Sequence, residues 1–179
     1  MIRLPGPAAP APETAQLLSL TVRPGRPAPA TIVALAHQPA LLGPFLGWAA
    51  ALALTGVLPK RDHELLAMRA SWNCRSSFEW GEHAVDAAAA GLSDDEIDRI
   101  AAGPDAPGWT PSEAALLRAA DELHTSCRVG DATWAELAAT YDKGALVEIL
   151  FVVGQYTMLS MVAEGAAIAA EPDFRPLPG

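Results

Sequence analysis

The sequence predicts an all-α protein. Alanine dominates its apolar residues, and no long segment alternates between apolar and polar residues as a strand would. Apolar residues recur instead at helical spacing, as Leu65, Met68 and Trp72 do. The chain has 179 residues, of which 51% are hydrophobic, so it can bury one substantial core or at most two very small ones.

The first part of the chain is rich in proline. Residues 1–27 show little periodicity, which predicts an extended N-terminal arm. Residues 28–38 are expected to form a short helix that ends at Pro39, because the residue before a proline disfavours helical geometry. The uncharged segment 39–59 has the length of a membrane span, but early prolines and glycines interrupt it. We therefore expect a buried or interface helix over 39–56.

Six further helices are predicted from caps, prolines and apolar spacing. They cover residues 60–73, 78–90, 93–102, 111–127, 130–142 and 144–170. Asp62 is a plausible cap of the first, and Ser76 or Ser77 of the second. Ser93 and Glu96 have the spacing of a capping box. The last helix is apolar nearly all round, which is typical of a central or interfacial helix, and residues 171–179 form a tail.

Charge and composition limit the partners. The formal net charge is −9 and the twelve basic residues are scattered, so we expect no nucleic acid and no membrane as partner. Only 18% of residues are charged, which favours a homo-oligomer that hides part of its surface. A small molecule remains as the expected substrate.

Two cysteines, Cys74 and Cys127, stand 53 positions apart. Without a CxxC motif, a dithiol redox centre and a Cys-rich zinc site are excluded at the motif level. We expect two reduced thiols in a cytoplasmic protein, since the N-terminus also lacks the apolar core of a secretory signal.

One segment carries a candidate constellation. Glu79 and His83 are four residues apart on one predicted helix, so the carboxylate can orient the imidazole. Glu64 lies on the same helix face as Met68 and Trp72, where desolvation would favour its protonated form. Together the three groups suit acid–base catalysis. A solvated surface pair is the other interpretation of the spacing, and no metal or cofactor is expected because no second histidine stands at ligand spacing.

Residues 64–97 resemble the carboxymuconolactone decarboxylase family, which includes the alkylhydroperoxidase D group. The segments "WTPSEAALLRAADELHTSCRVGDATWAEL" and "ILFVVGQYTMLSMV" extend the resemblance to residues 28–170, the predicted helical domain. The resemblance implies an alkylhydroperoxidase D-like helical bundle that assembles into trimers or hexamers. It also implies roles for Glu64 and His83, which match the family's glutamate and histidine.

The chain departs from the peroxidase branch of that family. The two positions of its CxxC motif hold Ser76 and Glu79, and neither side chain can perform thiol–disulfide exchange. Glu82 stands where many relatives have the first of two adjacent histidines. The arrangement of Glu79 and His83 is closer to the decarboxylase branch, which has no cysteines there.

We therefore expect metal-free acid–base chemistry, a decarboxylation or related transformation of a small carboxylated lactone or oxygenated ring. His83 would shuttle the proton, Glu79 would orient it, and Glu64 would be a second acid or base. Candidate substrate-binding residues are Arg69, Arg75, Ser76, Trp80 and Tyr156. Two alternatives stay open: a peroxide-related redox protein that uses Cys74, and a non-catalytic binding or assembly module on the same fold.

Overall fold

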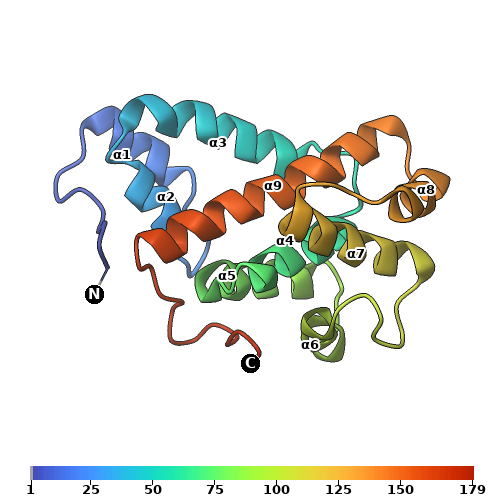
Figure 1. Ribbon diagram of the computed structural model, residues 1–179. Coiled ribbons are helices and arrows are strands. Elements are labelled where there is room, and N and C mark those ends of the chain that lie inside the picture. Colours follow the sequence, from blue (N-terminus) through green and yellow to red (C-terminus); the bar gives the residue numbers. More distant parts are fainter. Residues whose placement is uncertain (1) are drawn as a thin grey trace. The chain divides into compact units, whose positions relative to one another are not determined.

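The structure, a computed structural model, describes residues 2–179, which form nine helices (Figure 1). They are α1 (Pro12–Ser19), α2 (Ala30–Leu35), α3 (Pro39–Leu54), α4 (Lys60–Asn73), α5 (Ser77–Ala89), α6 (Asp94–Ala102), α7 (Pro111–Ser126), α8 (Asp131–Thr140) and α9 (Lys143–Gly165). Across this range no β-strand is formed, and β-pairing is confined to one isolated bridge between Arg23 and Arg26. The predicted all-α class is confirmed.

The chain divides into two compact units. The first comprises the chain up to Thr55 together with Val162–Ala169. Its core holds Ile32, Ala36 and Leu42, with leucines of α1 and α3 packed against them. Arg3 contacts the C-terminal part of this unit, because its backbone N–H donates to the Ala166 carbonyl at 2.8 Å.

The extended conformation expected for residues 1–27 is wrong at α1. Pro12 occupies the first turn, where its fixed φ suits a helix and its missing N–H costs nothing. Glu13 adds a favourable charge at the same end. Leu17 and Leu18 then pack on the core of the unit. Proline here opens a helix, although its abundance in the sequence suggested an arm.

Two helices, α3 and α9, are apolar enough to be compared with a membrane span. The helix α3 has 16 residues with Pro44 inside it, which is short for a span. By length and composition α9 is long and apolar enough to cross a membrane, but half of its most apolar window is buried in the protein, as in the core helix of a soluble protein. The helix α9 ends at Gly165, five residues before its predicted end.

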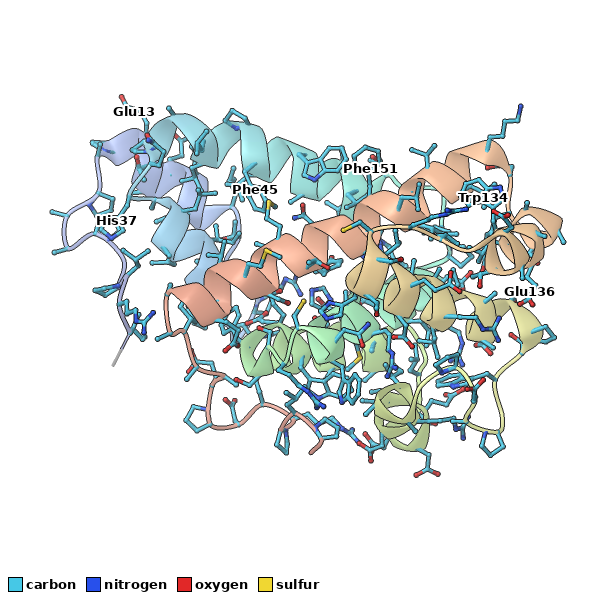
Figure 2. All side chains as sticks on the ribbon, in the orientation of Figure 1. Glu13, His37, Phe45, Trp134, Glu136 and Phe151 are labelled. Atoms are coloured by element: carbon cyan, nitrogen blue, oxygen red, sulfur yellow. The ribbon has the colours of Figure 1, made fainter. Side chains whose placement is uncertain are left out.

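The second unit comprises Gly56–Met161 and Ala170–Gly179. Within it, α4 packs against α5, α6 and α7, and α7 also packs against α8. The largest fully buried side chains include Trp80 and Phe78 of α5. Arg118 of α7 and Glu136 of α8 form an ion pair of 2.9 Å at the surface; Figure 2 labels Glu136.

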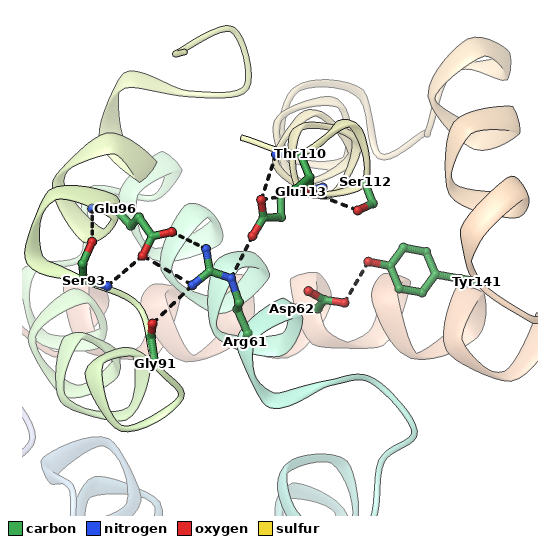
Figure 3. Close-up of polar contacts among 9 residues, drawn as sticks. All are labelled: Arg61, Asp62, Gly91, Ser93, Glu96, Thr110, Ser112, Glu113 and Tyr141. Carbon is green, nitrogen blue, oxygen red and sulfur yellow. Dashed lines mark hydrogen bonds and ion pairs between the residues drawn. The ribbon is translucent and has the colours of Figure 1, made fainter. Parts of the chain in front are cut away.

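Helix caps in this unit are only partly as predicted. The capping box of Ser93 and Glu96 is confirmed, and Thr110 with Glu113 forms a second one that starts α7. Asp62 is not the cap of α4, which begins directly after Pro59. The Asp62 carboxylate accepts a hydrogen bond from the Tyr141 hydroxyl at 2.8 Å instead (Figure 3).

Arg61 links the helices around the start of α4. Its guanidinium donates to Glu113 at 2.8 Å and pairs with Glu96 (Figure 3). The same two carboxylates close the capping boxes of α6 and α7. The partly buried Arg61 therefore holds the N-termini of α6 and α7 against α4, the helix that contains Glu64.

Candidate functional site

Neighbouring helices bring Glu64 and His83 into contact. Glu64 lies in the first half of α4 and His83 at the centre of α5, the helix packed beside it. His83 Nδ1 and Glu64 Oε2 are 2.8 Å apart. Both residues are buried, with 8% and 7% of their surface exposed. In this low-dielectric setting a charged hydrogen bond between carboxylate and imidazolium is strong.

This setting favours the protonated form of His83. Burial alone lowers the pKa of an imidazole, but the charge of Glu64 and its hydrogen bond outweigh burial here. The carboxylates of Glu79 and Asp86 act in the same direction, and the pKa of His83 is raised to about 9. At neutral pH the ring is therefore an imidazolium, with a proton to donate at Nε2.

Glu79 lies on the other side of the ring. Its Oε2 is 3.9 Å from His83 Nε2, which is an ion-pair distance and longer than a hydrogen bond. The oxygen that holds the ring by a hydrogen bond therefore belongs to Glu64, whereas the sequence pattern predicted Glu79 as the orienting group. The roles of the three residues in catalysis stay predictions.

The N-terminus of α5 differs from those of α6 and α7. All three have Ser or Thr followed three residues later by Glu, but only α6 and α7 form a capping box. In α5 the Ser76 side chain makes no cap hydrogen bond, and its buried hydroxyl has no hydrogen-bond partner among the described residues. Glu79 thus has the sequence of a capping residue but lies beside His83.

Tyr156 of α9 completes the surroundings of His83. The two rings pack edge to face with centroids 4.2 Å apart. The Tyr156 hydroxyl is 2.9 Å from Nε2 of His63, a second buried histidine on α4. Tyr156 was a predicted site residue, whereas His63 was not among the predicted residues. No local sequence signal could have found it, because its partner is 93 positions away.

The second histidine has the opposite charge state. Burial is the largest influence on His63 and lowers its pKa to about 4. Glu64 and Glu148 favour its charged form, while His83 and Lys60 oppose it. At neutral pH the site therefore holds one imidazolium, His83, and one neutral imidazole, His63.

Arg69 is not directed at a substrate. Its guanidinium donates twice to the Asp121 carboxylate, at 2.6 and 2.9 Å, and also to the carbonyls of Ile100 and Ala101. These bonds connect α4 to α6 and α7, so the side chain stabilises the packing. Four of its five N–H donors are therefore used within the protein, and its role in substrate binding stays a prediction.

Arg75 and Trp80 also differ from the expected substrate-binding surface. Arg75 is exposed, adopts φ = 56°, and lies over the Trp72 ring at 4.3 Å. Trp80 is fully buried in the core. Of the five candidate substrate-binding residues, Tyr156 contacts His83, and Ser76 lies on the same face of α5, since its spacing to Glu79 and His83 is three and seven.

Three groups of the site could hold a metal ion. Glu64, His83 and Asp86 offer ligand atoms within 4.8 Å of one another. The nitrogen of His83 that faces Glu64 carries a proton, however, and a metal would have to displace it. With a pKa of about 9, that displacement weakens metal binding at pH 7 by roughly a hundredfold. A metal ion at this position would therefore compete with that proton for His83.

A thiol lies outside this cluster. Cys74 follows α4, and its Sγ is 3.8 Å from Nδ1 of His124 on α7. The thiol is partly exposed, and neither it nor Cys127 forms a disulfide. An imidazole at this distance can accept the thiol proton.

The middle of the chain is similar to a known protein family. The model of the carboxymuconolactone decarboxylase family matches residues 39–122, a segment that contains Glu64, Glu79 and His83. Over this segment, slightly less than half of the chain, the sequence is similar to that family. The resemblance inferred from residues 64–97 is confirmed at family level, and Tyr156 lies outside the matched segment. Among curated proteins, none is significantly similar to the chain in sequence.

Solved structures share the fold over nearly the whole chain. An alkylhydroperoxidase AhpD core protein from Ralstonia eutropha JMP134, described as peroxidase-related, has a TM-score of 0.83 at 18% identity, covering 96% of this chain and 93% of its own. A peroxidase-related protein from Silicibacter sp. TM1040 has a TM-score of 0.82 at 17% identity, covering 96% and 91%. The debrominase Bmp8 has a TM-score of 0.80 at 16% identity, covering 94% of this chain and 91% of its own. At these identities the comparison establishes the alkylhydroperoxidase D-like fold.

Proposed function

We propose that the chain is an enzyme of the carboxymuconolactone decarboxylase type. It would perform metal-free acid–base chemistry, a decarboxylation or related ring transformation, on a small carboxylated lactone or similar oxygenated substrate. The observation that carries this proposal is the buried His83 imidazolium, held at Nδ1 by Glu64 at 2.8 Å. The match of residues 39–122 to the family model supports it.

The reaction needs a proton donor and a stabilised oxyanion. In a decarboxylation the bond between the carboxylate carbon and the ring breaks, its electron pair moves into a conjugated carbonyl, and carbon dioxide leaves. A proton is then added at carbon. His83 Nε2–H is the donor in this proposal, and Glu64 stabilises the imidazolium until the proton is given up. The neutral imidazole takes its next proton from solvent.

Two hydroxyls would bind the substrate. The Tyr156 ring packs on His83, so its hydroxyl lies near the donor and can stabilise the oxygen on which negative charge develops. The buried Ser76 hydroxyl, on the same helix face as Glu79 and His83, can donate to the substrate carboxylate. In this proposal the Ser76 hydroxyl binds the substrate in place of the guanidinium groups of Arg69 and Arg75.

The direct test is carbon dioxide release. Purified protein is incubated with a panel of small carboxylated lactones, and carbon dioxide is measured with and without enzyme. Release that depends on enzyme concentration supports the proposal. Absence of release from every member of the panel, by protein shown to be folded, argues for the non-catalytic binding or assembly module.

A second candidate, thiol-based peroxide chemistry, is favoured by the contact between Cys74 and His124. In this reaction a thiolate attacks the terminal peroxide oxygen, the O–O bond breaks, an alcohol leaves, and the cysteine is oxidised to sulfenic acid. We expect His124→Ala to slow alkylation of Cys74 about tenfold at neutral pH, because the base that removes the thiol proton is gone. Mass spectrometry of iodoacetamide-treated protein measures this.

The exposed Cys127 provides the internal control, since its alkylation rate should not change in the same variant. The peroxide assignment itself requires that pretreatment with an alkyl hydroperoxide block Cys74 before alkylation. A Cys74 that is equally reactive with and without His124, or after peroxide, contradicts it.

We also propose that the protein is a homo-oligomer, as expected from its low charge. Apolar side chains on one face of α9 are substantially exposed: Val147, Phe151, Met158 and Met161 (Phe151 is labelled in Figure 2). A patch of this kind favours association of copies. Native mass spectrometry should show trimers or hexamers, and Met158→Glu combined with Met161→Glu should reduce them to single chains.

Val85→Glu provides a control for this oligomer prediction, because Val85 is an exposed apolar residue of a different helix, α5. It should leave the mass unchanged. A wild-type protein that is a single chain at micromolar concentration contradicts the proposal.

A further inference from the structure

Tyr156 lies between two imidazoles of opposite charge state. Its ring is edge-to-face with His83 at 4.2 Å and with His63 at 5.5 Å. Its hydroxyl oxygen is 2.9 Å from His63 Nε2. All three side chains are buried, with 8% or less of their surface exposed, so water does not compete effectively for these contacts.

A neutral imidazole offers one donor and one acceptor, so the contact with Tyr156 can form in two ways. If Nε2 accepts, the hydroxyl proton of Tyr156 points at His63 and is not available to a ligand. If Nε2–H donates, the hydroxyl proton points away from His63. Only the second arrangement leaves Tyr156 able to donate to a substrate beside His83.

We propose that His63 is a positioning residue, whose Nε2–H donates to the Tyr156 oxygen and thereby directs the Tyr156 hydroxyl proton to the substrate oxygen on which negative charge develops. This inference rests on the acid–base function proposed above. It deepens that function by assigning the oxyanion-binding group and the residue that orients it. The substrate class it requires is one with a carbonyl or carboxyl oxygen that becomes anionic, such as an enolate oxygen.

The neutrality of His63 supports this arrangement. The groups that face it are Glu64 and Glu148, which favour a charged ring, and His83 and Lys60, which oppose it; burial exceeds each of them. A neutral ring can keep its proton on Nε2 without adding a second positive charge beside the His83 imidazolium. Two imidazoles around one tyrosine thus supply one proton donor and one orienting group.

A pair of neighbouring residues provides a matched control. Asp62 and His63 are consecutive on α4, and each contacts a tyrosine hydroxyl, Asp62 that of Tyr141 at 2.8 Å and His63 that of Tyr156 at 2.9 Å. The chain has two tyrosines. Tyr141→Phe therefore removes a partly buried tyrosine hydroxyl that donates to a carboxylate outside the proposed site.

The kinetic test is a double-mutant cycle. On a lactone that the wild-type enzyme decarboxylates, we expect His63→Ala and Tyr156→Phe each to lower kcat by about a hundredfold with KM changed by less than about threefold. The double variant should be no slower than either single variant, because both remove the same interaction. His63→Gln, whose amide N–H can donate, should restore kcat to within about tenfold of the wild type, and Tyr141→Phe should not change it.

A second measurement does not depend on activity. In protein labelled with 13C at the tyrosine Cζ, two resonances are expected, and Tyr141 is the internal reference. His63→Ala should shift the Tyr156 resonance only, and His63→Gln should return it toward the wild-type position. If the Tyr156 resonance does not move, the hydrogen bond does not form and the inference is overturned whatever the substrate is.

The two proposals fail in different ways. A wild-type enzyme that releases carbon dioxide while the two variants act additively, or leave kcat unchanged, overturns the role of His63 and leaves the proposed function in place. A wild-type protein that decarboxylates nothing overturns the function, and with it the role of the Tyr156 hydroxyl toward a substrate. In that case a shifted Tyr156 resonance would report a structural hydrogen bond only.

Discussion

Replacing His83 with glutamine is expected to lower the rate of carbon dioxide release by about a thousandfold or more. The His83 imidazolium lies between the carboxylates of Glu64 and Glu79 and is the proposed proton donor, whereas an amide cannot give up a proton at neutral pH. Glutamine is preferable to alanine here. Either replacement removes the cation from two buried carboxylates, which costs about 3–5 kcal/mol, but glutamine keeps an N–H that can donate to a carboxylate and fills more of the space.

Glu64→Gln tests the same assignment from the other partner. The charge of Glu64 is the largest influence that raises the pKa of His83, so its removal should lower that pKa and deplete the imidazolium near neutrality. We expect a rate that now falls as pH rises through neutrality, whereas the wild-type rate stays constant until about pH 9. The pH profile of carbon dioxide release measures this shift directly.

The combined variant, Glu64→Gln with His83→Gln, separates catalysis from folding. It replaces the charged pair by two neutral amides of similar size that can hydrogen-bond to each other. Circular dichroism and urea unfolding should report a folded protein with no turnover. Turnover that survives in all three variants would show that the proton comes from another group.

The fold could be predicted because most of its signals are local. Proline near the first turn, a Ser or Thr before a Glu, and glycine after a helix act within four residues, so α4 to α8 lie close to their predicted positions and only the end of α9 differs by five residues. The error at α1 has the same origin. Pro12 was counted as one of many breakers, although a single proline in the first turn starts a helix when leucines such as Leu17 can pack behind it.

The site could be predicted only in part, because its contacts are long-range. Spacing within one helix identified Glu79 and His83, and the apolar face of the next helix identified Glu64. Which carboxylate bonds the imidazole depends on the packing of α4 against α5, and no pattern within either helix encodes it. Arg69 shows the converse error, since its partner Asp121 is 52 positions away and nothing in the local sequence reveals that its donors are used.

The free energy of unfolding is expected to be largest near pH 6.5 as far as the two buried histidines determine it. The unfolded-state pKa of both is about 6.5. In the folded protein that of His83 is raised to about 9 and that of His63 lowered to about 4. The two residues therefore act on opposite sides of the maximum, and each can be tested with its own variant.

His83 governs the alkaline side. Its contribution to stability is fully present below pH 6.5, where folded and unfolded chains are both protonated. As pH rises from 6.5 to 9 the unfolded chain loses its proton first, so the free energy of unfolding falls by about 3 kcal/mol. His63 determines the change below pH 6.5. In the unfolded chain its imidazole is protonated below pH 6.5, whereas in the folded chain it is protonated only below about pH 4. This costs a similar amount as pH falls.

Urea unfolding between pH 4 and 9.5, at one protein concentration, measures both slopes. His83→Gln should flatten the alkaline side and leave the acid side, and His63→Gln should do the reverse. Carboxylates with a lowered pKa, such as Glu96 at about 2, also destabilise the protein in acid, but they act below pH 4.5 and remain in both variants. The difference between wild type and variant therefore isolates each histidine.

The same measurement bears on the chemistry without any substrate. The proposed mechanism requires that His83 carry a proton and that His63 carry no charge at the pH of reaction. An alkaline slope that is the same in wild type and His83→Gln would mean that the ring is not held as an imidazolium, and Glu64 would then lack the cation that makes its burial tolerable. Acid–base catalysis by this pair would fail on that result alone, because the proton that His83 is proposed to donate would not be there.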